Sequence, residues 1–290
     1  MDVQMAYLLG MILGNGEIQR GHTETIVSID IPHKKLETDD LKDASVYVLA
    51  STVDIRNIIE PCLETSVAVN SHKRSVTLSF KKANDSYVMK EIVRFIGGGL
   101  HHATMKMNKE LFDLSLDEKK ALLRGIADVT GYVRKSNYAF GNKDEIRVYI
   151  EVPKNWDLVI DIANMLKAVD VPIQTIDFGH PNFRDSNLEK YKDGKPNYWK
   201  KEHQIKIYAN EFIPIGFNVK HKQDALVKYS KRVLLVKKPE DTHKYYWEKP
   251  VRKKAKPFHP RVIDPSLPSL IRGKQFSSWT EIASILGYGE

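Results

Sequence analysis

Two apolar stretches of the chain share one pattern of hydrophobic, small and glycine positions. The first is YLLGMILGNGEI (residues 7–18), and the second is ALLRGIADVTGYV (residues 121–133). Leucine and methionine favour helix, and helical residues four apart lie on one face. Gly10 and Gly14 in the first stretch, and Gly125 in the second, therefore leave room for another helix backbone. The pattern predicts two helices that pack against each other as a pseudo-symmetric pair.

The elements that follow each of these helices come in the same order, which indicates an internal duplication. Ser115 and Glu118 form a capping-box pattern, which predicts that the helix of the second apolar stretch begins there. The tract after Gly16 is rich in turn residues. After these two helices, hydrophobic periodicity predicts strands over residues 25–31, 75–80, 146–152 and 204–209. It predicts further helices over residues 53–63, 86–95 and 156–169.

The predicted strands alternate apolar and polar residues, so each strand has one face for the core. In SVTLSF (residues 75–80), Val76, Leu78 and Phe80 share one face and the hydroxyl residues share the other. The polar faces carry Arg, Lys, Gln, Ser, Thr and Tyr, which can hydrogen-bond base edges and phosphates. A sheet face that is merely solvated needs polar residues as well, so alternation alone leaves both interpretations open.

Composition and charge narrow the choice of partner. The chain has 290 residues, of which 42% are hydrophobic and 28% charged, with a net charge of +8 and a pI of about 9.2. This excess favours a polyanionic partner, although many basic proteins bind nothing acidic. The single cysteine, Cys62, fits a reducing compartment. With no signal peptide and no apolar run near the roughly 20 residues of a membrane span, we expect an intracellular monomer, cytoplasmic or nucleoid-associated.

The motifs LLGMILGNG (residues 8–16) and LRGIADVTG (residues 123–131), their spacing and the strands after each resemble the LAGLIDADG homing endonucleases in their two-repeat, single-chain form. The resemblance covers roughly residues 5–235. It implies an α+β fold of two pseudo-symmetric αββαββα halves, whose sheets form a saddle along the DNA major groove. The expected boundaries are a first half (1–112), a second half (113–236), and a basic arm with a C-terminal helix (237–290).

The chain departs from this family at the positions that carry its chemistry. The family places one acid before the last glycine of each motif, where it holds a divalent metal. Asn15 and Thr130 stand there instead and supply no charge, while Asp128 matches a family position that is usually not a metal ligand. Lys220 matches a basic position near the family's active site. We therefore assign no catalytic residue and no metal site, and Mg²⁺ would be required only if other carboxylates restored cleavage.

The prediction for function is a sequence-specific double-stranded DNA-binding protein that has lost cleavage. Two alternatives stay open: a metal-dependent site-specific endonuclease with displaced carboxylates, and an intron maturase that binds structured RNA. The residues expected to contact DNA are Gln19, Ser28, Asp30, Thr77, Ser79, Arg134, Arg147, Tyr149, Glu151, Gln204, Lys206, Tyr208, Lys220, Arg252, Lys253 and Lys254.

Three further segments are less specific. His101 and His102 follow a run of three glycines and are expected to be surface histidines of a loop. The polar tract over residues 182–201 reads as a long loop or hairpin between two strands. The ending SSWTEIASILGYGE (residues 277–290) resembles the first helix of a helix-turn-helix, and we expect a helix that packs on the body.

Overall fold

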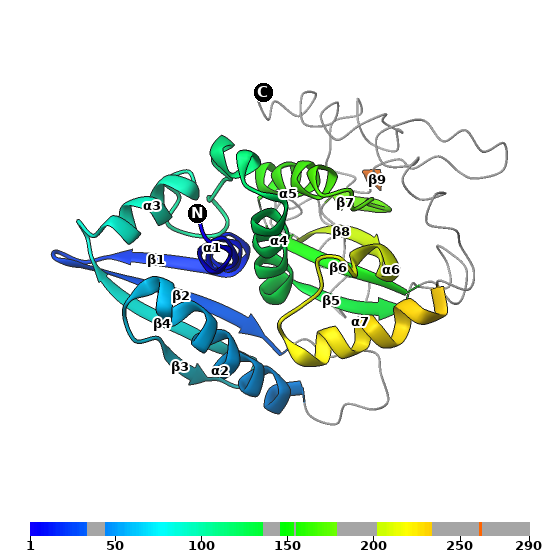
Figure 1. Ribbon diagram of the computed structural model, residues 1–290, viewed down its shortest axis with the longest axis horizontal. Helices are drawn as coiled ribbons and strands as arrows, with labels where there is room; N and C mark the ends of the chain where they lie inside the picture. Colours follow the sequence, from blue (N-terminus) through cyan, green and yellow to red (C-terminus); the bar gives the residue numbers. More distant parts are fainter. Residues whose placement is uncertain (34–43, 136–145, 154, 179–201, 234–260, 263–290) are drawn as a thin grey trace, which may run out of the picture.

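The computed structural model describes residues 1–33, 44–135, 146–153, 155–178, 202–233 and 261–262. Two β-sheets lie side by side, and helices pack on one face of each sheet (Figure 1). The predicted α+β class and the duplication into two similar halves are confirmed. No helix in the described part of the chain is both long enough and apolar enough to span a membrane.

The first half has the order αββαββα. Its first helix begins at the N-cap Asp2, whose carboxylate accepts a hydrogen bond from the backbone of Met5 at 2.6 Å. The elements are α1 (Val3–Asn15), β1 (Gly16–Arg20), β2 (Glu24–Pro32), α2 (Ala44–Leu63), β3 (Ala68–Ser71), β4 (Ser75–Ala83) and α3 (Tyr87–Phe95).

The second half repeats this order and adds one helix and one strand. It begins after a short 3₁₀ helix, η1 (Lys109–Asp113), with the predicted capping box between Ser115 and Glu118 fully formed. The elements are α4 (Leu116–Thr130), β5 (Gly131–Lys135), β6 (Ile146–Pro153), α5 (Trp156–Ala168), β7 (Thr175–Phe178), β8 (Glu202–Tyr208), α6 (Ala209–Phe212), α7 (Lys220–Val233) and β9 (Arg261–Val262).

The two sheets share one strand order and one register. The first sheet runs β1-β2-β4-β3, and the second runs β5-β6-β8-β7 with β9 added parallel to β7. Gly16, which follows α1, pairs with Ile29, and Gly131, which follows α4, pairs with Ile150. Each motif helix therefore leads directly into the first strand of its sheet at an equivalent place.

Helices α1 and α4 cross at the centre and hold the halves together (Figure 1). A Cβ atom built on Gly10 would lie 2.0 Å from the backbone oxygen of Leu122, and one built on Gly125 would lie 2.1 Å from that of Tyr7. The same offset along the chain separates Gly10 from Gly125 and Tyr7 from Leu122. The two contacts are therefore one contact repeated by a pseudo-twofold axis, and each needs a residue without a side chain.

A buried polar cluster fixes α7 to this helix pair. Asp128 and Lys222 are both fully buried. The Asp128 carboxylate accepts hydrogen bonds from the Tyr7 hydroxyl at 2.8 Å and from the backbone N–H groups of Asn218 and Val219 at 3.0 to 3.1 Å. The Lys222 ammonium group donates to the Asp128 backbone oxygen at 2.6 Å. Burial raises the pKa of Asp128, and the charge of Lys222 opposes that shift.

The connection between the halves is fastened to α5. The Asn155 side chain, the N-cap of α5, donates to the backbone oxygens of residues 102 and 105 at 2.8 and 2.7 Å. The Asp161 carboxylate accepts a hydrogen bond from the backbone N–H of Met107 at 3.0 Å. Burial raises the pKa of Asp161 to about 6. The second half thus supplies the groups that position the connection.

Some local predictions differ from the structure. The turn-rich tract after Gly16 begins with strand β1, and only residues 21–23 form the turn of a β1–β2 hairpin. Helix α2 begins at Ala44, earlier than the predicted start at residue 53. Strands β3 and β7 were not predicted, because they have four residues each and β3 lacks a buried face.

Candidate nucleic-acid interface

The face of each sheet that the helices do not cover is built almost wholly from polar side chains. On the first sheet, apolar residues of β2 and β4 fill the core, and the alternate residues point the other way. Cross-strand pairs on that open face join Glu17 to Ser28, Ser28 to Ser79, and Asp30 to Thr77. The predicted contact residues of the first half therefore lie together on one surface.

The open face of the second sheet holds larger and more basic side chains. Tyr132 stacks on Tyr149 with ring centroids 5.4 Å apart, and the Lys206 ammonium group lies 5.5 Å from the Tyr149 ring. The Arg147 guanidinium lies 5.9 Å from the Tyr208 ring. Cation–π contacts of this kind hold long side chains in place while the charge is retained. Arg134, Glu151 and Gln204 complete the predicted set on this face.

Two predicted contact residues of this face are less accessible than alternation suggested. Arg147 is 4% exposed and Tyr149 is 7% exposed. Both lie on β6, between β5 and β8, and the aromatic rings and long side chains of those strands pack against them. Tyr149 and Arg147 therefore contact and position their neighbours on this face. Lys206 and Tyr208 on β8 are half-buried and more accessible.

The two faces differ in charge. The first carries Glu17, Glu24 and Asp30 against Lys81, together with serine and threonine hydroxyls. The second carries Arg134, Arg147 and Lys206 against Glu151, so it is the more basic of the two. A phosphate backbone attracts cations at any sequence, whereas hydroxyls and carboxylates respond to base edges. The two faces would therefore make unequal contributions to affinity and specificity.

The ends of the motif helices do not offer a ligand set for a hard divalent cation. The Asn15 amide donates to the backbone oxygen of Asp30 at 2.8 Å. The Thr130 hydroxyl donates to the backbone oxygen of Ile126, one turn back in α4, at 2.6 Å, and Thr130 is buried. Across the described residues, no three His, Cys, Asp or Glu side chains are grouped closely enough to hold a metal ion. Each motif helix thus ends on an uncharged side chain that donates to a backbone oxygen, whereas Mg²⁺ is usually held in proteins by carboxylate oxygens.

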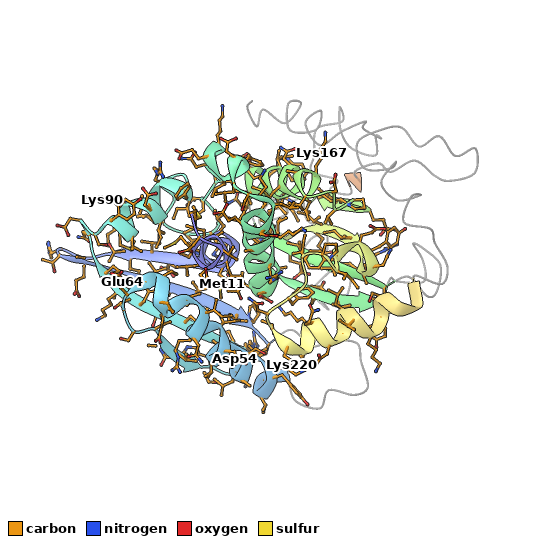
Figure 2. The ribbon with its side chains drawn as sticks, viewed as in Figure 1. Met11, Asp54, Glu64, Lys90, Lys167 and Lys220 are labelled. Carbon is orange, nitrogen blue, oxygen red and sulfur yellow. The ribbon has the colours of Figure 1, made fainter. Side chains whose placement is uncertain are left out.

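Lys220 does not occupy the place that the sequence assigned to it. Its ammonium group pairs with the Asp224 carboxylate at 2.8 Å within α7, and its backbone N–H donates to Ser51 of α2 at 2.9 Å. Figure 2 shows Lys220 at the start of α7, beside α2. The lysine that reaches the end of α4 is Lys222. The position along the helix decides which lysine reaches α4, because helical residues two apart, such as Lys220 and Lys222, point to different sides of the helix.

The surface histidines after the glycine run lie against the first sheet. The backbone of residues 100–102 pairs with the free edge of β1 through hydrogen bonds of 2.7 and 2.9 Å, and Glu17 and His101 form an antiparallel bridge. Opposite residues in such a bridge point to the same face. The exposed side chain of His101 therefore extends the polar row that begins with Glu17 and Ser28.

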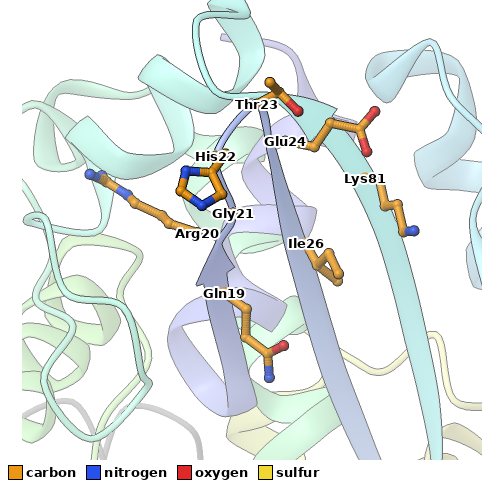
Figure 3. Close-up of a pocket in the computed structure, with 8 residues that line it drawn as sticks. All are labelled: Gln19, Arg20, Gly21, His22, Thr23, Glu24, Ile26 and Lys81. Atoms are coloured by element: carbon orange, nitrogen blue, oxygen red, sulfur yellow. The ribbon is translucent and has the colours of Figure 1, made fainter.

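Basic residues at the β1–β2 turn are further candidates that the sequence analysis missed. A shallow pocket of about 350 Å³ lies at this end of the first sheet (Figure 3). Arg20 and Lys81 bring cationic side chains to it and His22 brings an imidazole, beside the predicted residue Gln19. The available signal was the pair of basic residues around a short hairpin turn. The pocket is lined by Gln19, Arg20, Gly21, His22, Thr23, Glu24, Ile26 and Lys81.

The remaining predicted contacts lie outside the described residues. They are Arg252, Lys253 and Lys254 of the basic arm; the tract over residues 182–201 and the C-terminal segment also fall there. Strands β7 and β8 flank that tract on either side.

Comparison with solved structures finds similar folds at low identity. Structures of mesophilic variants of the homing endonuclease I-DmoI match with 13% identity and a TM-score of 0.42, over 73% of this chain and 92% of that one. I-DmoI in complex with DNA and Ca matches with 12% identity and a TM-score of 0.39, over 73% and 86% of the two chains.

A second solved protein also matches. Full-length DUF199/WhiA from Thermatoga maritima has 13% identity and a TM-score of 0.40, and the match covers 81% of this chain and 61% of that one. No protein-family model and no curated protein sequence matches the chain. At this identity and TM-score, the function of the chain has to come from its own residues.

Proposed function

We propose that this protein binds double-stranded DNA at a specific sequence, with the open faces of both sheets against the major groove, and does not cut it. The observation that carries the proposal is the pair of polar sheet faces on either side of the α1–α4 crossing. These faces combine amide, hydroxyl, carboxylate, guanidinium and ammonium groups, which are the groups that read base edges. A net charge of +8 supports a polyanionic partner.

The chemistry at the helix ends supports binding without cleavage. Hydrolysis of a phosphodiester by this type of fold needs carboxylates that hold divalent cations. Asn15 and Thr130 instead direct their side chains to backbone oxygens. The contacts that hold the helices together remain, because Gly10 and Gly125 still allow the backbones to touch. The packing of α1 against α4 therefore does not depend on an acidic residue at the end of either helix.

Selection of bound duplexes from a random library tests this function. The selection is run once with Mg²⁺ and once with EDTA, and the recovered DNA is examined for breaks. We expect one long enriched sequence, bound equally well in EDTA and left intact. Cuts that need Mg²⁺ would establish an endonuclease whose carboxylates lie elsewhere.

A competition experiment separates DNA from RNA as the partner. The enriched duplex is challenged with structured RNA of equal length at the same salt concentration. We expect the duplex to remain bound, because A-form RNA presents a deep and narrow major groove that side chains cannot enter. Failure to enrich any duplex, together with tight RNA binding, would overturn the proposal.

A further inference from the structure

The strand registers relate each position on one open face to a position on the other. Gly16 pairs with Ile29 and Gly131 pairs with Ile150, so the next residues, Asp30 and Glu151, are equivalent. On the neighbouring strands, Thr77 lies opposite Asp30, and Gln204 lies opposite Glu151. Each half therefore carries a carboxylate next to a neutral hydrogen-bond donor at the same place in its sheet.

Most other equivalent positions have different chemistry. By the same registers, Ser79 on β4 corresponds to Lys206 on β8, and Ile26 on β2 corresponds to Arg147 on β6. Glu17 corresponds to Tyr132. The carboxylate and its neutral partner are thus a feature that the two described faces keep while their charges diverge.

Neutral groups on the neighbouring strands donate hydrogen bonds to both carboxylates. The Thr77 hydroxyl donates to Asp30 Oδ1. The Gln204 amide donates to Glu151 Oε1 at 2.9 Å, and the Tyr132 hydroxyl donates to the same oxygen at 2.7 Å. A carboxylate has acceptor sites for about four hydrogen bonds, so an orienting hydrogen bond does not by itself exclude a ligand. Asp30 is exposed and Glu151 is half-buried.

A carboxylate on a DNA-reading face lowers affinity for every sequence unless a base donates to it. In the major groove the donors are the amino groups of cytosine and adenine, whereas guanine and thymine present carbonyl acceptors. Adenine places the acceptor N7 beside its amino group, and that lone pair repels a carboxylate. Cytosine presents N4 without such a neighbour, so it is the base that fits best.

We propose that Asp30 and Glu151 are matched specificity residues, each selecting a cytosine, at two positions related by the pseudo-twofold axis of the DNA site. This inference rests on the proposed function. It follows that the site is palindromic at these two positions, with one cytosine on each strand. Elsewhere the half-sites differ, because the faces that read them differ.

Selection in EDTA with the wild type, Asp30→Asn and Glu151→Gln tests the pair. We expect the wild type to enrich cytosine at two symmetric positions. Asp30→Asn should reduce that preference about 5- to 150-fold at one position only and favour adenine there, since amides pair with adenine N6 and N7. Glu151→Gln should do the same at the other position.

Glu24→Gln is the matched control, because it removes the same charge from the far end of β2. It should leave both cytosines enriched. Thermal unfolding of each variant checks the fold, and Asp30→Asn changes an exposed side chain, so it decides the first position even if Glu151→Gln unfolds. For the second position, Glu151→Asp keeps the charge and shortens the reach, so it should weaken cytosine enrichment without favouring adenine.

The outcomes separate this inference from the proposed function. An enriched site with A·T base pairs at both positions would overturn the inference alone, because no cytosine is present there. Variants that leave every base preference unchanged would overturn it as well. A wild type that cuts the enriched site only with Mg²⁺, together with an Asp30→Asn variant that binds with unchanged preferences but no longer cuts, would show that Asp30 holds a metal. That result would overturn both the proposed function and this inference. No enriched duplex for the wild type would instead overturn the proposed function.

Discussion

The Tyr7 hydroxyl and the Asp128 carboxylate form a 2.8 Å hydrogen bond that joins the two halves across 121 residues of sequence. Both side chains are buried, and burial raises the pKa of Tyr7 well above its usual value, with the charge of Asp128 adding to the shift. The hydroxyl therefore stays protonated and donates at any physiological pH. This bond links α1 and α4 at their shared interface.

Tyr7→Phe should lower the free energy of unfolding by about 1.5–3 kcal/mol, the range for hydrogen bonds to charged groups. The ring keeps its packing, so the loss reports the hydroxyl. Urea unfolding followed by tryptophan fluorescence measures it. Tyr87→Phe is the control, because Tyr87 is 76% exposed, and its change should stay within about 0.5 kcal/mol. Equal effects in both variants would contradict the role of the bond.

Gly10→Ala should disrupt the junction between the halves. The new Cβ would meet the backbone oxygen of Leu122 at 2.0 Å, and backbone cannot move aside as a side chain can. We expect a loss of more than about 3 kcal/mol, in the range of severe overpacking. Gly98→Ala is the comparison: it has open space but a φ of +75°, so about 1 kcal/mol is expected from backbone strain. Comparable melting temperatures for the two variants would refute the close contact.

The sequence was sufficient for features that local patterns encode. The motif helices follow from apolar residues with glycines at helical spacing, and the capping box at Ser115 and Glu118 specifies where α4 begins. Alternation predicted the core face of β4. Strand β3 was out of reach because its four residues are largely exposed and show no alternation. Its pairing with β4 depends on tertiary contacts.

The site was harder to predict than the fold. Alternation placed Arg147 and Tyr149 on the polar face, but both are buried, and both contact side chains of β8, a strand distant in sequence. The lysines of KHK (residues 220–222) are chemically identical, and only the position of Asp128 shows which one lies inside. Cross-strand partners and helix phase, which sequence patterning does not contain, therefore decided the roles of these residues.

The two lysines at the start of α7 should differ sharply when replaced. Lys222→Met leaves Asp128 buried without the cation that offsets its desolvation, so we expect a loss of about 3–5 kcal/mol. Lys220→Met breaks an exposed pair with Asp224, and the effect should be at most about 1 kcal/mol. Chemical denaturation measures both. A larger loss for Lys220→Met would mean that the buried cluster does not hold α7 in place.

Asp161 should make stability fall as pH rises from about 4 to 6. Burial raises its pKa from 3.8 to about 6 in the folded protein, so the unfolded chain loses the proton first. The stability that the protonated form contributes is complete below pH 4 and lost above pH 6. Asp161→Asn should remove this slope and raise stability at pH 7 by about 1–3 kcal/mol.

Asp157→Asn is the control for this pH dependence. Asp157 lies on α5, as Asp161 does, and its side chain is 29% exposed. The substitution removes its ion pair with Lys106, which lies in the connection between the halves. The slope between pH 4 and 6 should persist in this variant. Unfolding by urea at a series of pH values compares the two. A slope that disappears in Asp157→Asn and survives in Asp161→Asn would reverse the assignment.

Lys206→Ala tests the second sheet as a reading surface. Lys206 is half-buried on β8, and its ammonium group lies 5.5 Å from the Tyr149 ring, so its direction is fixed while its charge remains. If it contacts a base, its loss should relax the preference at one position by about 1–3 kcal/mol. If it contacts only phosphate, binding should weaken equally on all sequences and the salt slope should fall by about one. We expect the first result. Titrations of the enriched duplex and of single-base variants at several salt concentrations distinguish the two results. Arg147→Ala is unsuitable for this test, because loss of a buried side chain also affects folding.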